Sequence, residues 1–132
     1  MTMHATGSFK ITSWDEKPFS EVAGGGKLTH ASVVKTYAGE IQGVGTLHYL
    51  MTYRLDGSAE FHGYERFVGQ VRDRVGSFVL QHSGIFANGK ANEVSSVVQD
   101  SGTGALIGLR GHSEFSAAHQ QEYPVTLDYH FG

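Results

Sequence analysis

The chain has 132 residues, of which 39% are hydrophobic and 17% are charged, and its formal net charge is −3 at pH 7. This length predicts a single domain over 1–132 with a core large enough to need no covalent staples. The absence of cysteine excludes a disulfide scaffold, a thiolate nucleophile and a sulfur-ligated metal, and the ten scattered basic residues exclude the basic surface typical of nucleic-acid-binding proteins.

Apolar and polar residues alternate along most of the chain. The clearest segment is 123–131, where every second residue is apolar or aromatic, and this period is typical of a β-strand with one buried face. The same pattern predicts eight strands, in chain order 2–13, 28–37, 40–55, 59–68, 75–86, 91–98, 112–117 and 123–131. We expect Pro18, with the charged residues before it, to end the first strand, because proline cannot donate to a ladder.

Turn residues separate these segments. Asp56-Gly57 and Asn88-Gly89 are the pairs favoured in two-residue hairpins, and the glycines at 24–26 predict a flexible turn. The segment that begins at Asp100 is expected to be a longer loop with at most one short helical turn around Leu106. Eighteen glycines are typical of tight turns and coiled strands.

Eight strands in a near-sequential meander leave two free edges, which closure into a barrel removes. We therefore predict an all-β fold, an eight-stranded antiparallel β-barrel with short turns, and a two-sheet sandwich is the alternative. A barrel of this size is filled by side chains or holds one small ligand. No apolar run approaches the roughly 18 residues of a membrane span, and the N-terminus lacks a signal peptide, so a cytoplasmic protein without membrane contact is expected.

One carboxylate falls in phase with core positions. Glu65 shares the inward register of Ala59, Phe61 and Phe67. A carboxylate that points into an apolar barrel must be paired, or protonated through a raised pKa. Glu65 is therefore interpreted either as half of a buried ion pair or as a general acid or base.

Tyrosine and histidine bring polar tips to the same interior. Tyr49 and Tyr53 share a face with Leu47 and Met51, and His82 is in phase with Phe78, although the register of 75–86 is ambiguous. This mix is typical of a small-molecule pocket, and a core whose polar tips bond to backbone or water is the other interpretation. The candidate site comprises Glu65 and His82 as proton-handling residues and, as ligand-binding residues, Tyr49, Tyr53, Phe67, Phe78 and Trp14.

No metal or nucleotide cofactor is expected. The eight histidines include no pair two or four residues apart, so no single strand or helix face offers two ready ligands. The segment 24–29 lacks the spacing of a phosphate loop and has Leu28 where the magnesium-binding hydroxyl belongs. A Gly-x-Ser-x-Gly elbow is also absent.

Four ordered segments resemble one family. They are Ser13-Trp14-Asp15-Glu16, Gly76-Ser77-Phe78-Val79-Leu80-Gln81-His82-Ser83-Gly84, Ser101-Gly102-Thr103-Gly104 followed by Gly108-Leu109-Arg110-Gly111, and Thr126-Leu127-Asp128-Tyr129. The chain resembles a family of uncharacterised small bacterial proteins, a domain of unknown function whose fold is similar to the allene oxide cyclase and dirigent barrels. The resemblance implies an antiparallel eight-stranded barrel with a central cavity, often in a symmetric homo-oligomer. Where relatives have tryptophan in a Trp-Ser/Thr-Val-Val run, this chain has Ser95, which predicts a larger or more polar pocket if that position lines the cavity.

These observations give three functional hypotheses. The first is a cofactor-free, isomerase- or cyclase-like enzyme that acts on a small, largely apolar organic molecule. Its cavity would hold one conformer and exclude water, while Glu65 and His82 move protons. The second is a non-catalytic binder of a hydrophobic ligand, and the third is a filled barrel whose role is self-association. A fold alone does not decide among them.

Overall fold

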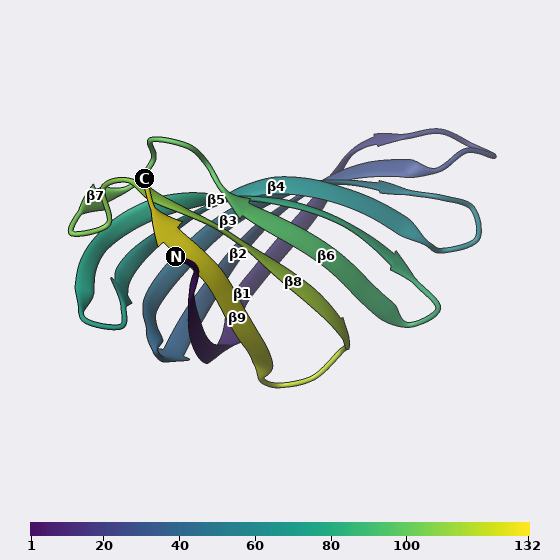
Figure 1. Cartoon of the computed structure of the whole chain (residues 1–132). Coiled ribbons are helices and arrows are strands. Elements are labelled where there is room, and N and C mark those ends of the chain that lie inside the picture. The colour runs from purple at the N-terminus through teal and green to yellow at the C-terminus, as the bar shows by residue number, and fades with distance from the viewer.

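The computed structural model describes residues 1–132, and it consists of β-strands and the turns between them (Figure 1). The strands are β1 (Met3–Glu21), β2 (Lys27–Gly39), β3 (Ile41–Tyr53), β4 (Ala59–Val71), β5 (Arg74–Ala87), β6 (Lys90–Val97), β7 (Thr103–Gly104), β8 (Leu109–Ala118) and β9 (Tyr123–Phe131). No helix long and apolar enough to cross a membrane is present.

The eight long strands form a closed antiparallel barrel. Around the barrel the order is β1-β2-β3-β4-β5-β6-β8-β9, and β9 pairs with β1 to close the ring. The predicted all-β fold, an eight-stranded antiparallel barrel, is confirmed. The two-residue strand β7 is an addition that the sequence pattern did not indicate, and it pairs with β5 through Gly76↔Gly104 and Ser77↔Thr103.

The prediction that Pro18 ends the first strand was wrong. β1 continues to Glu21, and Pro18 pairs with Thr29 of β2. β9 accompanies β1 only as far as Phe9, so the second half of β1 has a neighbour on one side alone. Proline is tolerated there because that half is an edge strand, and a register shift follows Pro18 directly.

Two other local expectations can be compared with the structure. The segment around Leu106 forms turns rather than a helical element: the Leu106 amide donates to the Thr103 carbonyl at 3.0 Å and the Leu109 amide to the Leu106 carbonyl at 3.1 Å. In β5, Phe78 and His82 are buried whereas Val75 is exposed. The ambiguous register of that strand is therefore resolved with His82 inside the barrel.

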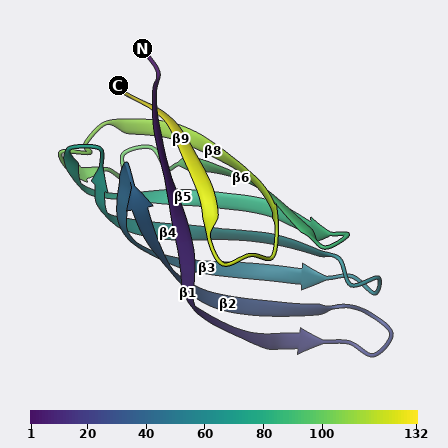
Figure 2. The same ribbon diagram turned by 90° about the horizontal axis from the view of Figure 1, so that it is seen from below.

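The wall of the barrel is shortest between β8 and β9. These strands pair only from Leu109↔Phe131 to His112↔Asp128, and beyond this point they diverge and are joined by the turn at 119–122 (Figure 1). The β1–β2 hairpin extends away from β9 in the same region, which Figure 2 shows from below. A gap therefore separates the far halves of β1 and β8.

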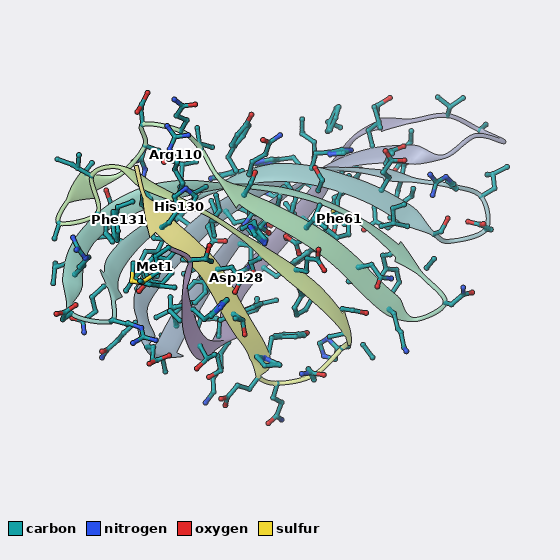
Figure 3. All side chains as sticks on the ribbon, in the orientation of Figure 1. Met1, Phe61, Arg110, Asp128, His130 and Phe131 are labelled. Atoms are coloured by element: carbon teal, nitrogen blue, oxygen red, sulfur yellow. The ribbon has the colours of Figure 1, made fainter.

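The interior contains two apolar layers. The larger cluster lies toward the end where the two termini meet and includes Ala5, Ile41, Val71, Leu109 and Tyr129. The smaller cluster comprises Ala31, Val33, Leu47, Tyr49, Met51 and Phe61. In Figure 3, Phe131 and His130 lie at the end with the termini and Phe61 lies toward the other end. Buried polar side chains lie between the two clusters.

Candidate functional site

One connected cluster of polar side chains inside the barrel comes from five adjacent strands. Strand alternation directs each of them inward, because every second residue of a strand faces the same side. They are Lys35 and Tyr37 of β2, Tyr49 of β3, Glu65 of β4, His82 of β5, and Glu93 and Ser95 of β6.

Glu65 is the centre of this cluster and is completely buried, at 0% exposure. Its Oε2 accepts a hydrogen bond from the Tyr37 hydroxyl at 2.6 Å, and its Oε1 accepts from His82 Nε2 at 2.7 Å. Lys35 Nζ lies 3.5 Å from the same Oε1. Burial raises the pKa of Glu65, but the Lys35 charge and the hydrogen bonds from His82 and Tyr37 outweigh that effect and hold the pKa at about 2. Glu65 is therefore an ionised, fully paired carboxylate.

His82 bridges two carboxylates. Nε2 contacts Glu65, and Nδ1 contacts Glu93 Oε1 and lies 2.7 Å from Ser95 Oγ. A carboxylate can only accept, so an imidazolium that donates from both nitrogens satisfies this arrangement. Burial lowers the pKa of His82, whereas the hydrogen bonds to Glu65 and Glu93 raise it, and the net direction is upward.

Glu93 belongs to the buried cluster and also lines a large cavity, which is described below. Its Oε1 also accepts from the Tyr49 hydroxyl at 3.0 Å. Burial raises the pKa of Glu93, but hydrogen bonding to His82 and the His82 charge lower it by more. The pKa of Tyr49 is well above its ordinary value because of burial and the Glu93 charge, so Tyr49 is a neutral hydrogen-bond donor.

A cavity of about 860 Å³ lies on the Glu93 side of the cluster. Fifteen of its 23 lining residues are hydrophobic, and its polar lining includes Lys35, Tyr49 and Glu93. Trp14 of β1 and the β8 end at Ala117 and Ala118 also line it, so the cavity lies beside the gap between β1 and β8. Its volume is within the range of roughly 300–1,000 Å³ typical of small-molecule sites.

A second hollow, of about 40 Å³, lies on the other side of the cluster. Its lining includes Phe67, Phe78, Lys35, His82 and Ser95. Ser95 therefore faces the barrel interior, and its hydroxyl bonds to His82. The prediction of a larger or more polar pocket depended on this inward position. A small hydroxyl at this position leaves both the void and the polar contact.

A second, smaller group of polar side chains, centred on Glu16, lies beside the large cavity. Glu16 Oε2 accepts from Tyr53 at 2.5 Å and from Thr29 at 2.7 Å, while Oε1 accepts from Trp14 Nε1 at 3.1 Å. Burial and the hydrogen bond to Glu16 together raise the pKa of Tyr53 to about 12. The Trp14 ring lies 6.2 Å from that of Tyr49. Glu16 thus positions two aromatic side chains that line the cavity.

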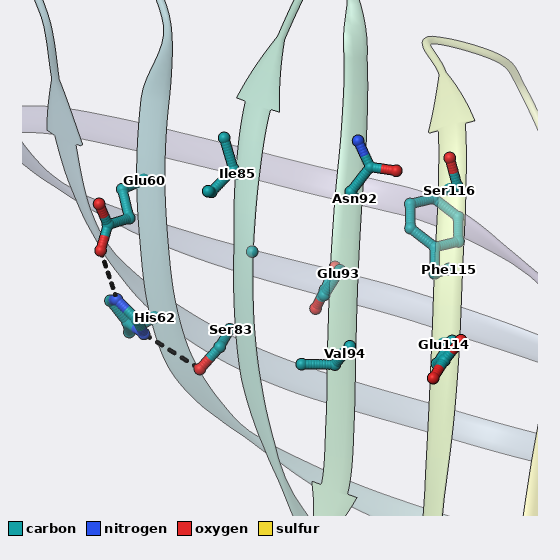
Figure 4. Close-up of a pocket in the computed structure, with 11 residues that line it drawn as sticks. Glu60, His62, Ser83, Ile85, Asn92, Glu93, Val94, Glu114, Phe115 and Ser116 are labelled. Carbon is teal, nitrogen blue, oxygen red and sulfur yellow. Dashed lines mark hydrogen bonds and ion pairs between the residues drawn. The ribbon is translucent and has the colours of Figure 1, made fainter.

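The outer face of the barrel has a separate groove of about 640 Å³ across β4, β5, β6 and β8 (Figure 4). In it, His62 Nδ1 lies 3.0 Å from Ser83 Oγ and His62 Nε2 lies 3.4 Å from Glu60 Oε1. This arrangement has the residue types of a nucleophilic triad. Ser83 is paired with His62 on one side and Val94 on the other, in the middle of the sheet, so the surrounding backbone amides serve the ladder rather than an oxyanion. We assign no catalytic role to this groove.

The structure brings only some of the sequence-predicted site residues to the large cavity. Tyr49, Tyr53 and Trp14 line it, whereas Phe67 and Phe78 line the small void. Glu65 and His82 contact each other as part of the buried cluster. Of these two, His82 lines the small void, and Glu65 lines neither hollow.

Sequence reasoning missed Lys35, Tyr37 and Glu93. A signal for them existed, because Lys35 falls in phase with Val33 in β2 and Glu93 falls in phase with Ser95 in β6. No group of three or more histidine, aspartate or glutamate side chains is arranged to hold a metal ion.

The fold and the cavity define an eight-stranded antiparallel barrel with a hollow, partly polar interior. A model of a family described as "Protein of unknown function (DUF3224)" matches residues 5–129, and the chain belongs to this family. The chain is similar to the crystal structure, at 1.84 Å resolution, of a DUF3224 protein of unknown function from Shewanella oneidensis MR-1. The two share 28% sequence identity with a TM-score of 0.83, over 100% of this chain and 99% of that one. No curated protein matches the chain. The likeness to allene oxide cyclase barrels stays a prediction.

Proposed function

We propose that this barrel binds a small, largely apolar organic molecule in the cavity beside β1 and β8. The observation that carries the proposal is the cavity itself: about 860 Å³, mostly hydrophobic walls, and Lys35, Tyr49 and Glu93 gathered on its polar side. Apolar walls with a few convergent polar groups are typical of ligand sites, since the walls supply affinity and the polar groups fix orientation. The ligand body would lie against Trp14 and Tyr53.

Two adjacent residues of β8 offer a matched test. Ala117 lines the cavity, whereas Ser116 lies on the outer groove. Ala117→Trp fills the cavity and should abolish binding of an environment-sensitive apolar dye, while Ser116→Trp should leave binding unchanged. Both variants should keep the strand-type circular dichroism of the wild type. Equal dye binding by the two variants would contradict the proposal.

A catalytic form of this function is a cofactor-free isomerase- or cyclase-like proton transfer. The arrangement that favours it is the line Glu93–His82–Glu65, which joins a carboxylate on the cavity wall to a buried imidazole. Glu65 itself is a weak base at neutral pH, because its pKa is about 2. A catalytic role therefore requires Glu93 to contact the substrate while His82 and Glu65 orient it.

The variant Glu93→Gln separates binding from catalysis. Glutamine keeps the shape and an acceptor oxygen for the Tyr49 hydroxyl, but it removes the charge. In a binder, an uncharged apolar dye should retain its affinity in Glu93→Gln. In an enzyme, turnover of a substrate once identified should fall by about 10²–10⁴, the range typical of a lost acid–base group. Unchanged turnover in Glu93→Gln would rule out the proposed catalytic function.

A further inference from the structure

The ammonium group of Lys35 has more hydrogen-bond donors than the protein supplies with acceptors. Its side chain is only 5% exposed, and its one polar contact is Glu65 Oε1 at 3.5 Å. That oxygen already accepts from His82 at 2.7 Å. An ammonium carries three donors, and the other close neighbour of Nζ is the face of the Phe9 ring, 4.4 Å away.

Lys35 borders both hollows of the barrel. It lines the large cavity and the small void, so its side chain lies at the boundary between the polar cluster and the ligand space. A buried ammonium with incomplete hydrogen bonding is costly to the protein unless something else completes it.

The charges around this space favour an anion. Glu93 is the one carboxylate on the cavity wall, and it is already engaged by His82 and by the Tyr49 hydroxyl. His82 and Lys35 offset the charges of Glu65 and Glu93 within the cluster. Lys10, at the cavity edge, adds a further positive charge.

We propose that the ligand is an organic acid, a carboxylate on an aromatic or aliphatic body, and that its carboxylate accepts hydrogen bonds from Lys35 Nζ. This inference rests on the proposed function and names the ligand class. Charge-assisted bonds between an ammonium and a carboxylate are roughly twice as strong as neutral ones. The apolar body of the acid would occupy the aromatic part of the cavity, next to Trp14 and Phe115.

The test compares three probes that share one apolar body: 4-butylbenzoate, 4-butylbenzyl alcohol and 4-butylbenzylamine. Affinities are measured by isothermal titration calorimetry, and the fluorescence of Trp14, the single tryptophan of the chain, reports whether the probe enters the cavity. The benzoate should bind about tenfold more tightly than the alcohol, because its carboxylate bonds to the Lys35 ammonium through opposite charges whereas the alcohol is neutral. The amine should bind most weakly.

Variants of Lys35 then assign the preference to this residue. Lys35→Met should bring the affinities for benzoate and alcohol together while alcohol binding persists, and Lys35→Arg should retain the preference for the acid. Lys17→Met, at an exposed position outside the cavity lining, is the matched control and should behave as the wild type. If Lys35→Met does not fold, the probe ranking in the wild type and in Lys35→Arg decides.

The outcomes separate this inference from the proposed function. Binding of the alcohol as tight as that of the benzoate overturns the organic-acid inference and leaves a ligand cavity in place. A preference for the amine also overturns it and makes Glu93 the anchor. If no probe binds and Trp14 fluorescence does not respond, both proposals fail.

Discussion

The carboxylate of Glu65 fills the space that a side chain at Gly45 would need: a Cβ on Gly45 would overlap Oε2 of Glu65 and lie 3.1 Å from Cε1 of Tyr37. Gly45 lies on β3, two residues before Leu47, which pairs with Glu65. Glycine in a strand interior often marks the close approach of another group, and here that group is the central carboxylate of the polar cluster.

We therefore expect Gly45→Ala to destabilise the protein. The methyl group must displace the Glu65 carboxylate and disturb its hydrogen bond with Tyr37, and overpacking of a well-packed interior costs about 1–3 kcal/mol. Urea denaturation measures the change. Gly25→Ala, in the exposed turn before β2, is the control, since its nearest neighbour is the exposed side chain of Val22 at 3.3 Å. Equal stability of the two variants would contradict this account.

Glu65→Gln distinguishes an ion-pair role from a direct catalytic one. The substitution removes the charge that Lys35 and His82 share, and breaking a buried pair typically costs about 3–5 kcal/mol. Thermal unfolding should show a large fall in Tm. Glu60→Gln on the outer face removes an exposed carboxylate that pairs with Arg54, and exposed pairs contribute at most about 1 kcal/mol. A Glu65→Gln protein as stable as the wild type but deficient in ligand turnover would favour Glu65 as the acid–base group.

The pH dependence of stability should have a plateau in the weakly acidic range. The pKa of Glu65 falls from its ordinary 4.5 to about 2 on folding, so its contribution is present above pH 4.5 and is lost as the pH falls toward 2. The pKa of His82 rises from 6.5, so its contribution is present below pH 6.5 and is lost as the pH rises through the folded value. Urea midpoints measured from pH 3 to pH 9 should therefore be highest between about 4.5 and 6.5. In His82→Gln the decline on the alkaline side should shrink, and an undiminished decline would assign it to other groups.

We also propose that the chain self-associates through an apolar strip on the outer face of β3 and β4. Val44 pairs with Val68 across these strands, and both residues are exposed, as are Leu50 and Tyr64. A self-complementary patch on one face is what a two-fold symmetric dimer requires. Light scattering should give a mass above 14.3 kDa for the wild type, and Leu50→Glu should shift it to the monomer. A wild-type monomer at high concentration would rule the strip out as a dimer interface.

The sequence was informative wherever burial follows the period of two. Glu65 and His82 were placed inside the barrel because each is in phase with apolar neighbours, and the structure buries both. Their mutual contact could not be predicted, because it depends on the stagger between β4 and β5, where Gly63 pairs with His82. Pairing across strands is a tertiary property that no local pattern contains.

Positions where a strand departs from regular apolar–polar alternation were the least predictable. The register shift between Ile11 and Ser13 in β1 is one such place, and no local pattern marked it. A bulge adds one residue to one strand and reverses the facing of those that follow. The free edge of β1 allowed the strand to continue past Pro18, and the sequence carries no mark of which strand will lack a neighbour.

The short seam between β8 and β9 has a kinetic consequence. It has four residue pairs, against eleven between β2 and β3, and local opening events involve the regions with the fewest cooperative bonds. Transient separation of β9 from Leu109–His112 would widen the gap between β1 and β8 beside the cavity, while the other strand pairs stay intact. The residence time of a bound molecule would then follow the breathing of this one seam, and the amide protons of β8 and β9 should exchange with solvent well before those of β3 and β4.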